Sequence, residues 1–390
     1  MRRKWLIAAS IAAAAAAALL WPFVRGQYRA LRPALAPPPA DIGREIETSS
    51  SPLHLPPGFH IEIFSKDIPD ARVLAFDPDG NLWVSQIGLG KLTRLEIRAG
   101  KVVGSKIFTG FKHPHGLAFD PKNPRMLYLA EENRISRTSI DGDPEWQKVA
   151  DLPGGGRHFS RTIGFGPDGR LYVAIGSTCD VCLERDARNA SIQVVEDGKL
   201  KEFARGLRNA VFFAFHPATG KMWATEMGRD NIGDEQPPDE IDVIEAGKNY
   251  GWPNCYGRNI HDAAFDKNVY IRNPCLEPFE IPSLIDIPAH SAPLGLAFAP
   301  ASWPEEYRHD FFVAYHGSWN RSVPAGYKVV RMMLDAGGKP LGSEDFIGGW
   351  LTADGQALGR PVDIAFGPDG AMYISDDKAG VVYRVIPPAK

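Results

Sequence analysis

The chain has 390 residues, of which 44% are hydrophobic and 23% charged, so its composition is that of a globular protein and excludes disorder as the overall state. Its formal net charge of -3 does not predict a nucleic-acid partner. With 39 glycines and 33 prolines, the sequence favours many short strands joined by turns over long helices.

The N-terminus has the pattern of an export signal. Arg2, Arg3 and Lys4 precede an apolar stretch over residues 5–24, which is long enough to span a bilayer. Positive charge on the leading side places the rest of the chain outside the cytoplasm. Because no small-x-small site follows directly, the pattern favours an uncleaved anchor over a cleaved signal peptide. We therefore assign residues 1–25 to a signal peptide or membrane anchor, with the protein either tethered at the periplasmic side of the inner membrane or secreted to the periplasm.

The next segment, residues 26–54, is rich in proline, with Pro33 followed by the run 37–39. This composition predicts an extended and mostly unstructured linker. The remaining residues, 55–390, are predicted to form one folded domain.

One sequence phrase recurs through that domain. An apolar-x-Phe-x-Pro segment, or a close variant of it, is followed by a polar turn and then by alternating apolar residues with an aromatic. Six phenylalanines mark the copies: Phe76, Phe119, Phe165, Phe215, Phe298 and Phe366. Alternation is the period of a strand, and the Pro-Asp-Gly turns suit a tight connection, so each copy is predicted to be a β-hairpin.

Six hairpins of this kind predict an all-β, six-bladed β-propeller, because one hairpin cannot bury both of its faces without neighbours. The first three intervals between the phenylalanines are 43, 46 and 50 residues, the length of a propeller blade, and the later intervals of 83 and 68 residues leave room for insertions. Two β-sandwiches would not explain six similar phrases. We expect a strand near residues 60–64 to close the ring by pairing with residues 381–385.

The four cysteines are an even number in a chain predicted to be exported, which favours two disulfides. The most local pairing joins Cys179 to Cys182 and Cys255 to Cys275, although four cysteines permit three connectivities. Haem attachment would need a histidine where Leu183 stands. Cys255 and Cys275 are too far apart in the sequence to form the second tight pair of a zinc site.

Two polar clusters stand at the entries of the third and fourth hairpins, where a propeller carries ligand-binding loops. His158 follows the glycine run 154–156, and a neutral imidazole there suits a general base, although a structural histidine explains the pattern equally well. Arg208 and Asn209 precede the fourth hairpin, where the arginine could bind a carboxylate or a quinone oxygen, or only loop carbonyls.

Two further clusters lie later in the chain. The acidic segment 226–244 and the glycine-rich run that contains Tyr250 offer the oxygen ligands that Ca²⁺ requires, with a solvated acidic loop as the alternative. Two late loops carry Arg321 and Arg360. Together with Arg208 they would bring three guanidinium groups to one mouth of the propeller, which predicts a polyanionic ligand.

Six ordered blocks give the sequence a recognisable character: GRHFSRTIGFGPDGRLYVAIG, GLRNAVFFAF, EMGRDNIGDEQPPDEIDVIEAGKNYGWPNCYG, AHSAPLGLAF, FVAYHGSWNRSVPAGYKVVR and GRPVDIAFGPDG. Over roughly residues 55–388 the chain resembles the sorbosone dehydrogenase branch of the soluble glucose/sorbosone dehydrogenases that depend on pyrroloquinoline quinone (PQQ). The resemblance implies an enzyme that uses PQQ and Ca²⁺ to oxidise a sugar or a sugar-derived aldehyde or alcohol, and that passes electrons to a quinone or cytochrome.

The resemblance also implies roles for five polar residues. His158 matches the base that takes the substrate hydroxyl proton while hydride passes to the quinone. Arg208 and Asn209 match a pair that contacts the reactive carbonyl side of the cofactor, with Arg208 also polarising that carbonyl. Arg360 matches a partner of a PQQ carboxylate, and Arg321 stands in for a lysine with the same task.

For the metal, the resemblance implies two calcium ions. The backbone carbonyls of Gly228 and Arg229 match the ligands of the calcium ion that accompanies the cofactor. Glu240 and Tyr250 fall in the segment that carries a second, structural calcium ion in glucose dehydrogenases.

The sequence departs from the glucose enzymes at the expected substrate position. Pro288 and His290 stand where those enzymes place an aromatic residue over the quinone, and Arg157 replaces an acidic neighbour of His158, so glucose itself is not assumed as the substrate. Two other functions stay open: a calcium-dependent lactonase or other hydrolase, which would show no quinone absorbance, and a non-catalytic extracellular propeller that binds carbohydrate or protein.

Overall fold

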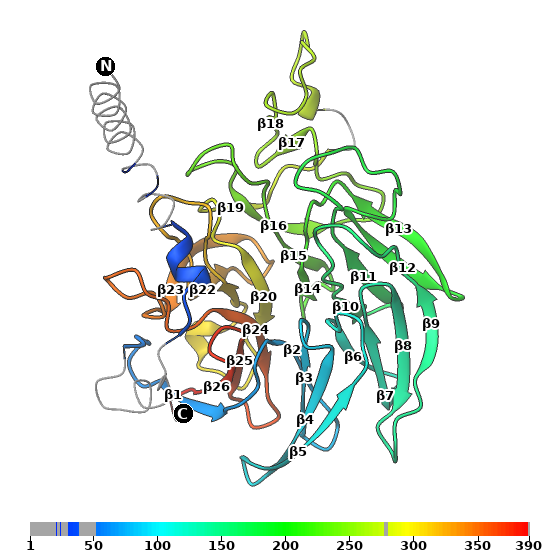
Figure 1. Ribbon diagram of the computed structural model, residues 1–390, viewed down its shortest axis with the longest axis vertical. Helices are drawn as coiled ribbons and strands as arrows, with labels where there is room; N and C mark the ends of the chain where they lie inside the picture. Colours follow the sequence, from blue (N-terminus) through cyan, green and yellow to red (C-terminus); the bar gives the residue numbers. More distant parts are fainter. Residues whose placement is uncertain (1–20, 22–23, 25–29, 39–51, 277–279, 389–390) are drawn as a thin grey trace, which may run out of the picture.

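In the computed structural model, which describes residues 21, 24, 30–38, 52–276 and 280–388, the chain forms six four-stranded antiparallel sheets arranged around a common axis (Figure 1). This architecture confirms the predicted six-bladed β-propeller.

The first three blades follow the chain without interruption. Blade 1 contains β2 (Ala71–Phe76), β3 (Leu82–Gln86), β4 (Lys91–Arg98) and β5 (Lys101–Thr109); blade 2 contains β6 (Leu117–Asp120), β7 (Asn123–Ala130), β8 (Arg134–Ser139) and β9 (Gln147–Asp151); blade 3 contains β10 (Ile163–Phe165), β11 (Leu171–Ile175), β12 (Ser191–Glu196) and β13 (Lys199–Arg205).

The last three blades include an insertion and the closing strand. Blade 4 contains β14 (Phe212–Phe215), β15 (Met222–Glu226), β16 (Asp239–Ile244) and β19 (Ile285–Ile287); blade 5 contains β20 (Pro293–Phe298), β21 (Phe311–Tyr315), β22 (Lys328–Leu334) and β23 (Pro340–Ile347); blade 6 contains β24 (Pro361–Phe366), β25 (Met372–Asp376), β26 (Val381–Ile386) and β1 (His60–Ser65).

Each marker phenylalanine lies in the first strand of a blade, which confirms that every copy of the repeated phrase forms a hairpin of the first two strands. Ring closure is also confirmed, because β1 pairs with β26 in antiparallel register from His60 opposite Ile386 to Ser65 opposite Val382. The blade that closes the ring therefore draws its strands from the two ends of the domain, which fixes both ends in one sheet.

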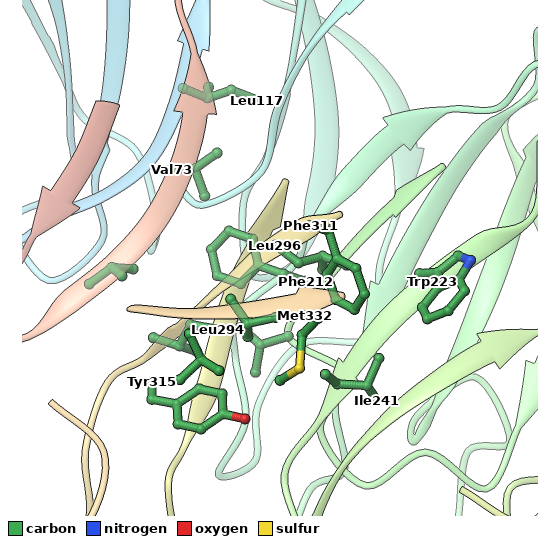
Figure 2. Close-up of a cluster of buried hydrophobic side chains, with 14 of the residues drawn as sticks. Val73, Leu117, Phe212, Trp223, Ile241, Leu294, Leu296, Phe311, Tyr315 and Met332 are labelled. Carbon is green, nitrogen blue, oxygen red and sulfur yellow. The ribbon is translucent and has the colours of Figure 1, made fainter. Parts of the chain in front are cut away.

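The core lies where the blades meet around the axis. The largest cluster of buried side chains joins first strands from several blades through Val73, Leu117, Phe212 and Leu294 (Figure 2). The second strands of blades 1, 3, 4, 5 and 6 are buried at every position rather than alternately, because a blade is covered on both faces by its neighbours. This burial fixes the inner ends of the loops that carry the polar residues.

The insertion of blade 4 contains a two-stranded hairpin, β17 (Cys255–Tyr256) and β18 (Ile260–His261), and the 3-10 turn η1 (Pro274–Leu276), while blade 5 carries the turn η2 (Glu305–Tyr307). Cys255 is bonded to Cys275 in the insertion and Cys179 to Cys182 in blade 3. Both disulfides of the predicted local pairing are thus confirmed.

The expectation of an extended linker is wrong for residues 30–35, which are helical. Ala30 and Pro33 are buried, and the Arg32 guanidinium donates to the Asp354 carbonyl oxygen at 2.9 Å, so packing against the propeller stabilises the helix. The predicted anchor over residues 1–25 lies almost entirely outside the described residues. Among the residues that the structure does describe, no helix has the length and apolar character needed to cross a bilayer.

Replacing Ile61, a buried residue of the closing strand, by aspartate should destabilise the propeller, because the new carboxylate would be buried without a partner. We expect a loss of about 2–4 kcal/mol in the free energy of unfolding, against about 1 kcal/mol for the control Ile61→Val. Thermal unfolding followed by tryptophan fluorescence measures both, and equal midpoints for the two variants would contradict the role of β1 in closing the ring.

Candidate functional site

The loops at one end of the propeller carry the candidate site. In an antiparallel blade, the start of the first strand and the end of the second strand lie at the same end. The residues before β10, β14, β20 and β24 therefore gather with those that follow β15, β21 and β25. We call this end of the propeller the mouth.

A cavity of about 220 Å³ opens at the mouth between blades 3, 4 and 5. Its lining combines cationic, anionic, amide and aromatic side chains: Arg157, His158, Arg208, Asn209, Met227, Gly228, Asp230, Asp239, His290, Ala292, Trp319 and Asn320. The cavity thus brings together His158, Arg208, Asn209 and Gly228, four of the residues that the sequence singled out from three separate segments.

The ring of His158 is held in one tautomer by its hydrogen bonds. Nδ1 lies 2.8 Å from Ser177 Oγ and 3.1 Å from the Ser177 carbonyl oxygen. Ser177 Oγ donates its own proton to the Cys179 carbonyl oxygen at 2.6 Å, so both Ser177 atoms can only accept from the imidazole. Nδ1 therefore carries the proton, and Nε2 keeps the lone pair that a general base needs.

A close approach of the backbone makes room for this histidine. Gly176 directly follows the second strand of blade 3, and a Cβ at this position would lie 2.6 Å from His158 Cβ and 2.8 Å from Asn209 Oδ1. No side chain fits in that space, so the glycine is what allows His158 and Asn209 to lie on either side of the strand end.

The protonation state of His158 is set by its surroundings. Burial, followed by the positive charges of Arg208 and Arg157, lowers the pKa of the imidazole to about 3. Each of these factors disfavours a cationic ring. His158 is therefore neutral over the physiological pH range and able to accept a proton.

Arg208 is almost fully buried and uses its guanidinium to bind protein oxygens. Nε donates to the Asp180 carbonyl oxygen at 2.9 Å, Nη2 to Asp180 Oδ1 at 2.8 Å and to Asp230 Oδ2 at 3.2 Å, and Nη1 to the Met227 carbonyl oxygen at 3.1 Å. Arg157 binds the same Asp230 oxygen at 2.6 Å. The two arginines and two aspartates form one charged network beside His158.

The far wall of the cavity is formed by two aromatic rings and an amide. His290 Nε2 donates to the Gly233 carbonyl oxygen at 2.8 Å, so Nδ1 accepts from the Asn320 amide, 3.2 Å away. Asn320 Nδ2 also reaches Asp230 Oδ1 at 2.7 Å, and Trp319 stands at the rim with 39% of its surface exposed. The flat rings of His290 and Trp319 suit a planar ligand with hydrogen-bonding groups at its edge.

Arg321 and Arg360 do not line this cavity. Arg360 donates to the carbonyl oxygens of His316 at 3.0 Å and Gly317 at 2.6 Å, and Arg321 donates to the Ala289 carbonyl at 3.2 Å and pairs with Glu235. Of the three guanidinium groups expected at the mouth, Arg208 lines this cavity, and the second arginine in its lining is Arg157. Arg360 is held by carbonyls of the loop that presents Trp319 and Asn320.

A second, internal cavity of about 20 Å³ adjoins the first and shares Gly228 and Arg208 with it. This volume holds a single water molecule or ion. Its lining includes the oxygen-bearing side chains of Glu226, Glu240, Tyr250 and Asp262, beside the guanidinium groups of Arg208 and Arg229. The two residues predicted for a structural calcium ion, Glu240 and Tyr250, are thus brought together.

The carboxylates near this cavity are buried, whereas Glu235, in the loop of the same acidic segment, is exposed to solvent. Glu226 and Glu240 lie opposite each other on neighbouring strands, and Asp242 follows on the same face of β16. Burial raises the pKa of all three carboxyls. Charge repulsion adds to this effect: Glu240 raises the pKa of Glu226, Asp242 that of Glu240, and Glu226 that of Asp242. Neither oxygen of Asp242 has a hydrogen-bond partner. This concentration of acid groups calls for protons or a cation.

The backbone carbonyls of Gly228 and Arg229 are available as ligands. Their oxygens accept no hydrogen bond from any residue that the structure describes, while the Gly228 amide donates to Asp239 Oδ1 at 2.9 Å and the Arg229 side chain binds Asp262 at 2.8 Å. Carbonyl oxygens are typical ligands of Ca²⁺.

A site for a thiolate-bound metal is excluded within the described residues. The sets of three possible ligand atoms close to one another are Cys179, Cys182 and Glu184, and Cys255, Cys275 and Glu280. In both sets the sulfurs belong to a disulfide and cannot act as thiolates.

Sequence reasoning missed Ser177, Asp180 and Asp230 as parts of the site. Asp180 stands inside the C-x-x-C motif and Asp230 inside the acidic segment, so both occur in segments already singled out. Their partner, Arg208, is 28 residues from Asp180 and 22 from Asp230, and no local pattern reports such a contact.

A family model described as TrAA12-like matches residues 53–387. The chain is similar to an uncharacterized protein of Borreliella burgdorferi, with 33% identity covering 87% of this chain and 92% of that protein. It is also similar to the aldose sugar dehydrogenase YliI of Escherichia coli, with 26% identity covering 60% of this chain and 61% of that protein.

Solved structures share the fold. The holo form of the PQQ domain of pyranose dehydrogenase from Coprinopsis cinerea matches with a TM-score of 0.71 and 21% identity, covering 85% of this chain and 96% of that one. A calcium structure of a family AA12 carbohydrate-active enzyme from Trichoderma reesei matches with a TM-score of 0.73 and 19% identity, covering 86% and 97%.

Replacing Arg208 by methionine should raise the pKa of His158, because it removes a positive charge that disfavours the imidazolium. Arg157→Met should raise it in the same direction by a smaller amount. NMR titration of ¹⁵N-labelled histidine measures the shift, with Arg170→Gln, at the opposite end of blade 3, as the control. A His158 titration that is the same in all four proteins would contradict the electrostatic account.

Proposed function

Because this chain belongs to the TrAA12-like family, we propose that it is a quinoprotein dehydrogenase that oxidises a sugar or a sugar-derived aldehyde or alcohol with PQQ and Ca²⁺. One observation carries the proposal: a neutral histidine with a free Nε2 lone pair lines a cavity beside two arginines. The names of its relatives, an aldose sugar dehydrogenase and the PQQ domain of a pyranose dehydrogenase, support the substrate class and the cofactor.

The residues of the cavity suit PQQ, a planar tricarboxylate. Arg157 and Arg208 offer positive charge, Asn209 offers an amide, and the rings of Trp319 and His290 offer flat surfaces. The free carbonyl oxygens of Gly228 and Arg229 would hold the calcium ion that accompanies the cofactor. Arg321 and Arg360 would act by holding the loop that presents Trp319 and Asn320.

When bound, PQQ supplies the quinone that accepts a hydride from the substrate carbon. The task of His158 is to take the proton from the substrate hydroxyl at Nε2 while Nδ1 remains bonded to Ser177. A polyanionic ligand would offset the charges of Arg157 and Arg208, raise the pKa of His158 and so make it a stronger base.

The substrate wall differs from that of the glucose enzymes. His290 lines the cavity and is fixed by Gly233 and Asn320, so a hydrogen-bonding ring stands near the position where the resemblance implies an aromatic residue in the glucose enzymes. This wall supports a sugar or sugar-derived aldehyde or alcohol that offers a polar group to His290, rather than glucose in particular.

A structural calcium ion at the second cavity would resolve the buried negative charge there. Glu226 and Glu240 line the cavity and supply carboxylates, and the volume of about 20 Å³ fits one ion. Glu240 and the segment of Tyr250 would contribute ligands, as the resemblance implied.

We also propose that the protein acts at the periplasmic side of the inner membrane. Arg32 of the helix over residues 30–35 binds Asp354, which precedes β24, and Lys378, which follows β25, binds the Ala36 carbonyl; both partners therefore lie in loops at the mouth. A tether through residues 1–25 would then hold the mouth toward the bilayer, where a quinone or cytochrome could accept electrons.

The full-length chain, reconstituted with PQQ and CaCl₂, should reduce a redox dye in the presence of a sugar or aldehyde panel. His158→Ala should lower kcat by about 10²–10⁴-fold, because the hydroxyl proton then has no positioned acceptor. Steady-state kinetics and quinone absorbance measure the outcome, and His60→Ala, at the exposed end of β1, serves as the control. A wild-type protein that binds no PQQ would contradict the proposed function.

Calcium should stabilise the protein more at alkaline than at acidic pH. Glu226, Glu240 and Asp242 have raised pKa values in the folded chain, so without calcium, stability falls as pH rises from the unfolded carboxyl value of about 4 through the raised folded values. Calcium favours the ionised carboxylates and should reverse this loss. Thermal unfolding with CaCl₂ or MgCl₂ at about pH 5 and pH 8 measures it; a calcium effect independent of pH would contradict the site.

A further inference from the structure

We propose that the loop closed by the Cys179–Cys182 disulfide is a positioning element for the reaction, holding both the base His158 and the buried cation Arg208 in place. The inference rests on the proposed dehydrogenase function and adds to it a role for the C-x-x-C motif. The disulfide joins residues only three apart, directly after the second strand of blade 3. It therefore fixes the conformation of a short loop at the edge of the cavity.

The first arm of the loop reaches His158. The Cys179 carbonyl oxygen accepts the proton of Ser177 Oγ, and this contact commits Ser177 Oγ to accept from His158 Nδ1. If the Cys179 carbonyl turned away, Ser177 Oγ could instead donate to Nδ1, and the proton of the imidazole could move to Nε2. Together with the Ser177 carbonyl oxygen, which lies 3.1 Å from Nδ1, the loop therefore supports the tautomer whose Nε2 is free to act as the base.

The second arm reaches Arg208. Asp180, enclosed by the disulfide, binds Arg208 twice, through its carbonyl oxygen at 2.9 Å and through Oδ1 at 2.8 Å. The same Oδ1 accepts from the Asp230 amide at 2.9 Å, and Trp252 Nε1 lies 3.4 Å from the Asp180 carbonyl. Asp180 therefore connects blade 3 to the loops before β14 and after β15 of blade 4, and to the insertion of that blade.

Apart from the disulfide, polar contacts hold the loop in place. Residues 178–182 are only partly buried, and the side chain that follows, Leu183, is 74% exposed. Glu184 holds the start of the loop through the Thr178 amide at 2.6 Å and Thr178 Oγ1 at 2.8 Å. Asp180 is therefore held by its hydrogen bonds to Arg208 and Asp230, and the disulfide adds a covalent constraint on the backbone that presents it.

The two disulfides of the chain should differ in what they do. A cross-link stabilises a fold mainly by restricting the unfolded chain, and this effect grows with the length of the closed loop. Cys255 and Cys275 are 20 residues apart, whereas Cys179 and Cys182 are three apart. Loss of the short disulfide should therefore affect the geometry of the site more than global stability, and loss of the long one should do the opposite.

The test compares the double variant Cys179→Ser with Cys182→Ser against wild type, using the full-length chain with PQQ and CaCl₂. We expect kcat to fall by about tenfold or more, because small displacements of catalytic groups have effects of that size. The ¹⁵N shifts of His158 should move toward a mixture of tautomers. The midpoint of thermal unfolding should fall less than in the matched variant Cys255→Ser with Cys275→Ser.

Asp180 variants separate its contacts from the sulfur chemistry. Asp180→Asn keeps an oxygen that can accept from Arg208 and should retain most of the activity, whereas Asp180→Ala should match the loss in the double cysteine variant. Wild-type kcat and wild-type His158 shifts in the double cysteine variant would overturn the inference. If wild type itself shows no turnover with PQQ, the proposed function fails, while unchanged His158 shifts in the cysteine variant would still overturn the positioning role.

Discussion

Arg208 places a permanent positive charge inside the protein, between blades 3 and 4, and the rest of the site is arranged around it. A buried guanidinium is stable only when its donors are satisfied, and here Asp180, Asp230 and the Met227 carbonyl satisfy them. The same charge lowers the pKa of His158 and keeps it neutral. Arg208 therefore joins blades 3 and 4 and lowers the pKa of His158, and it is also a cation that would attract an anionic ligand.

The propeller explains why such a network can exist in a chain of short strands. Each blade is covered on both faces, so second strands are buried throughout and loops at the mouth start from fixed points. The fold also buries Glu240 and Asp242 on β16, a strand that packs in the same way. The protein thus carries a paired network of arginines and aspartates and a cluster of buried carboxyls, and a divalent cation is the ligand that would stabilise the ionised form of that cluster.

Much of the fold could be predicted from the sequence because it depends on a local repeat. Phe76 and its five counterparts mark one strand in every blade, and the ring closure followed from the count. In the site, His158, Arg208 and Asn209 could be found because each precedes a marked strand. Asp180 and Asp230 could not, since their roles arise from contacts between blades. Arg360 was assigned to the ligand, although its nearest acceptors are the carbonyls of His316 and Gly317. The helix over residues 30–35 was missed because its stability comes from contact with the propeller.

The proposed reaction requires a neutral His158 to remove the proton of a substrate hydroxyl while hydride leaves the carbon that bears this hydroxyl. The most direct measurement is anaerobic single-turnover reduction of the quinone in the PQQ- and calcium-loaded protein, followed by absorbance, with an aldose and its C1-deuterated form across a range of pH. Reduction should be slower with the deuterated substrate. The rate should fall at acidic pH with an apparent pKa at or below the ordinary histidine pKa of about 6.5. Reduction that is insensitive to deuterium at every pH, or no change in the quinone absorbance, would contradict it.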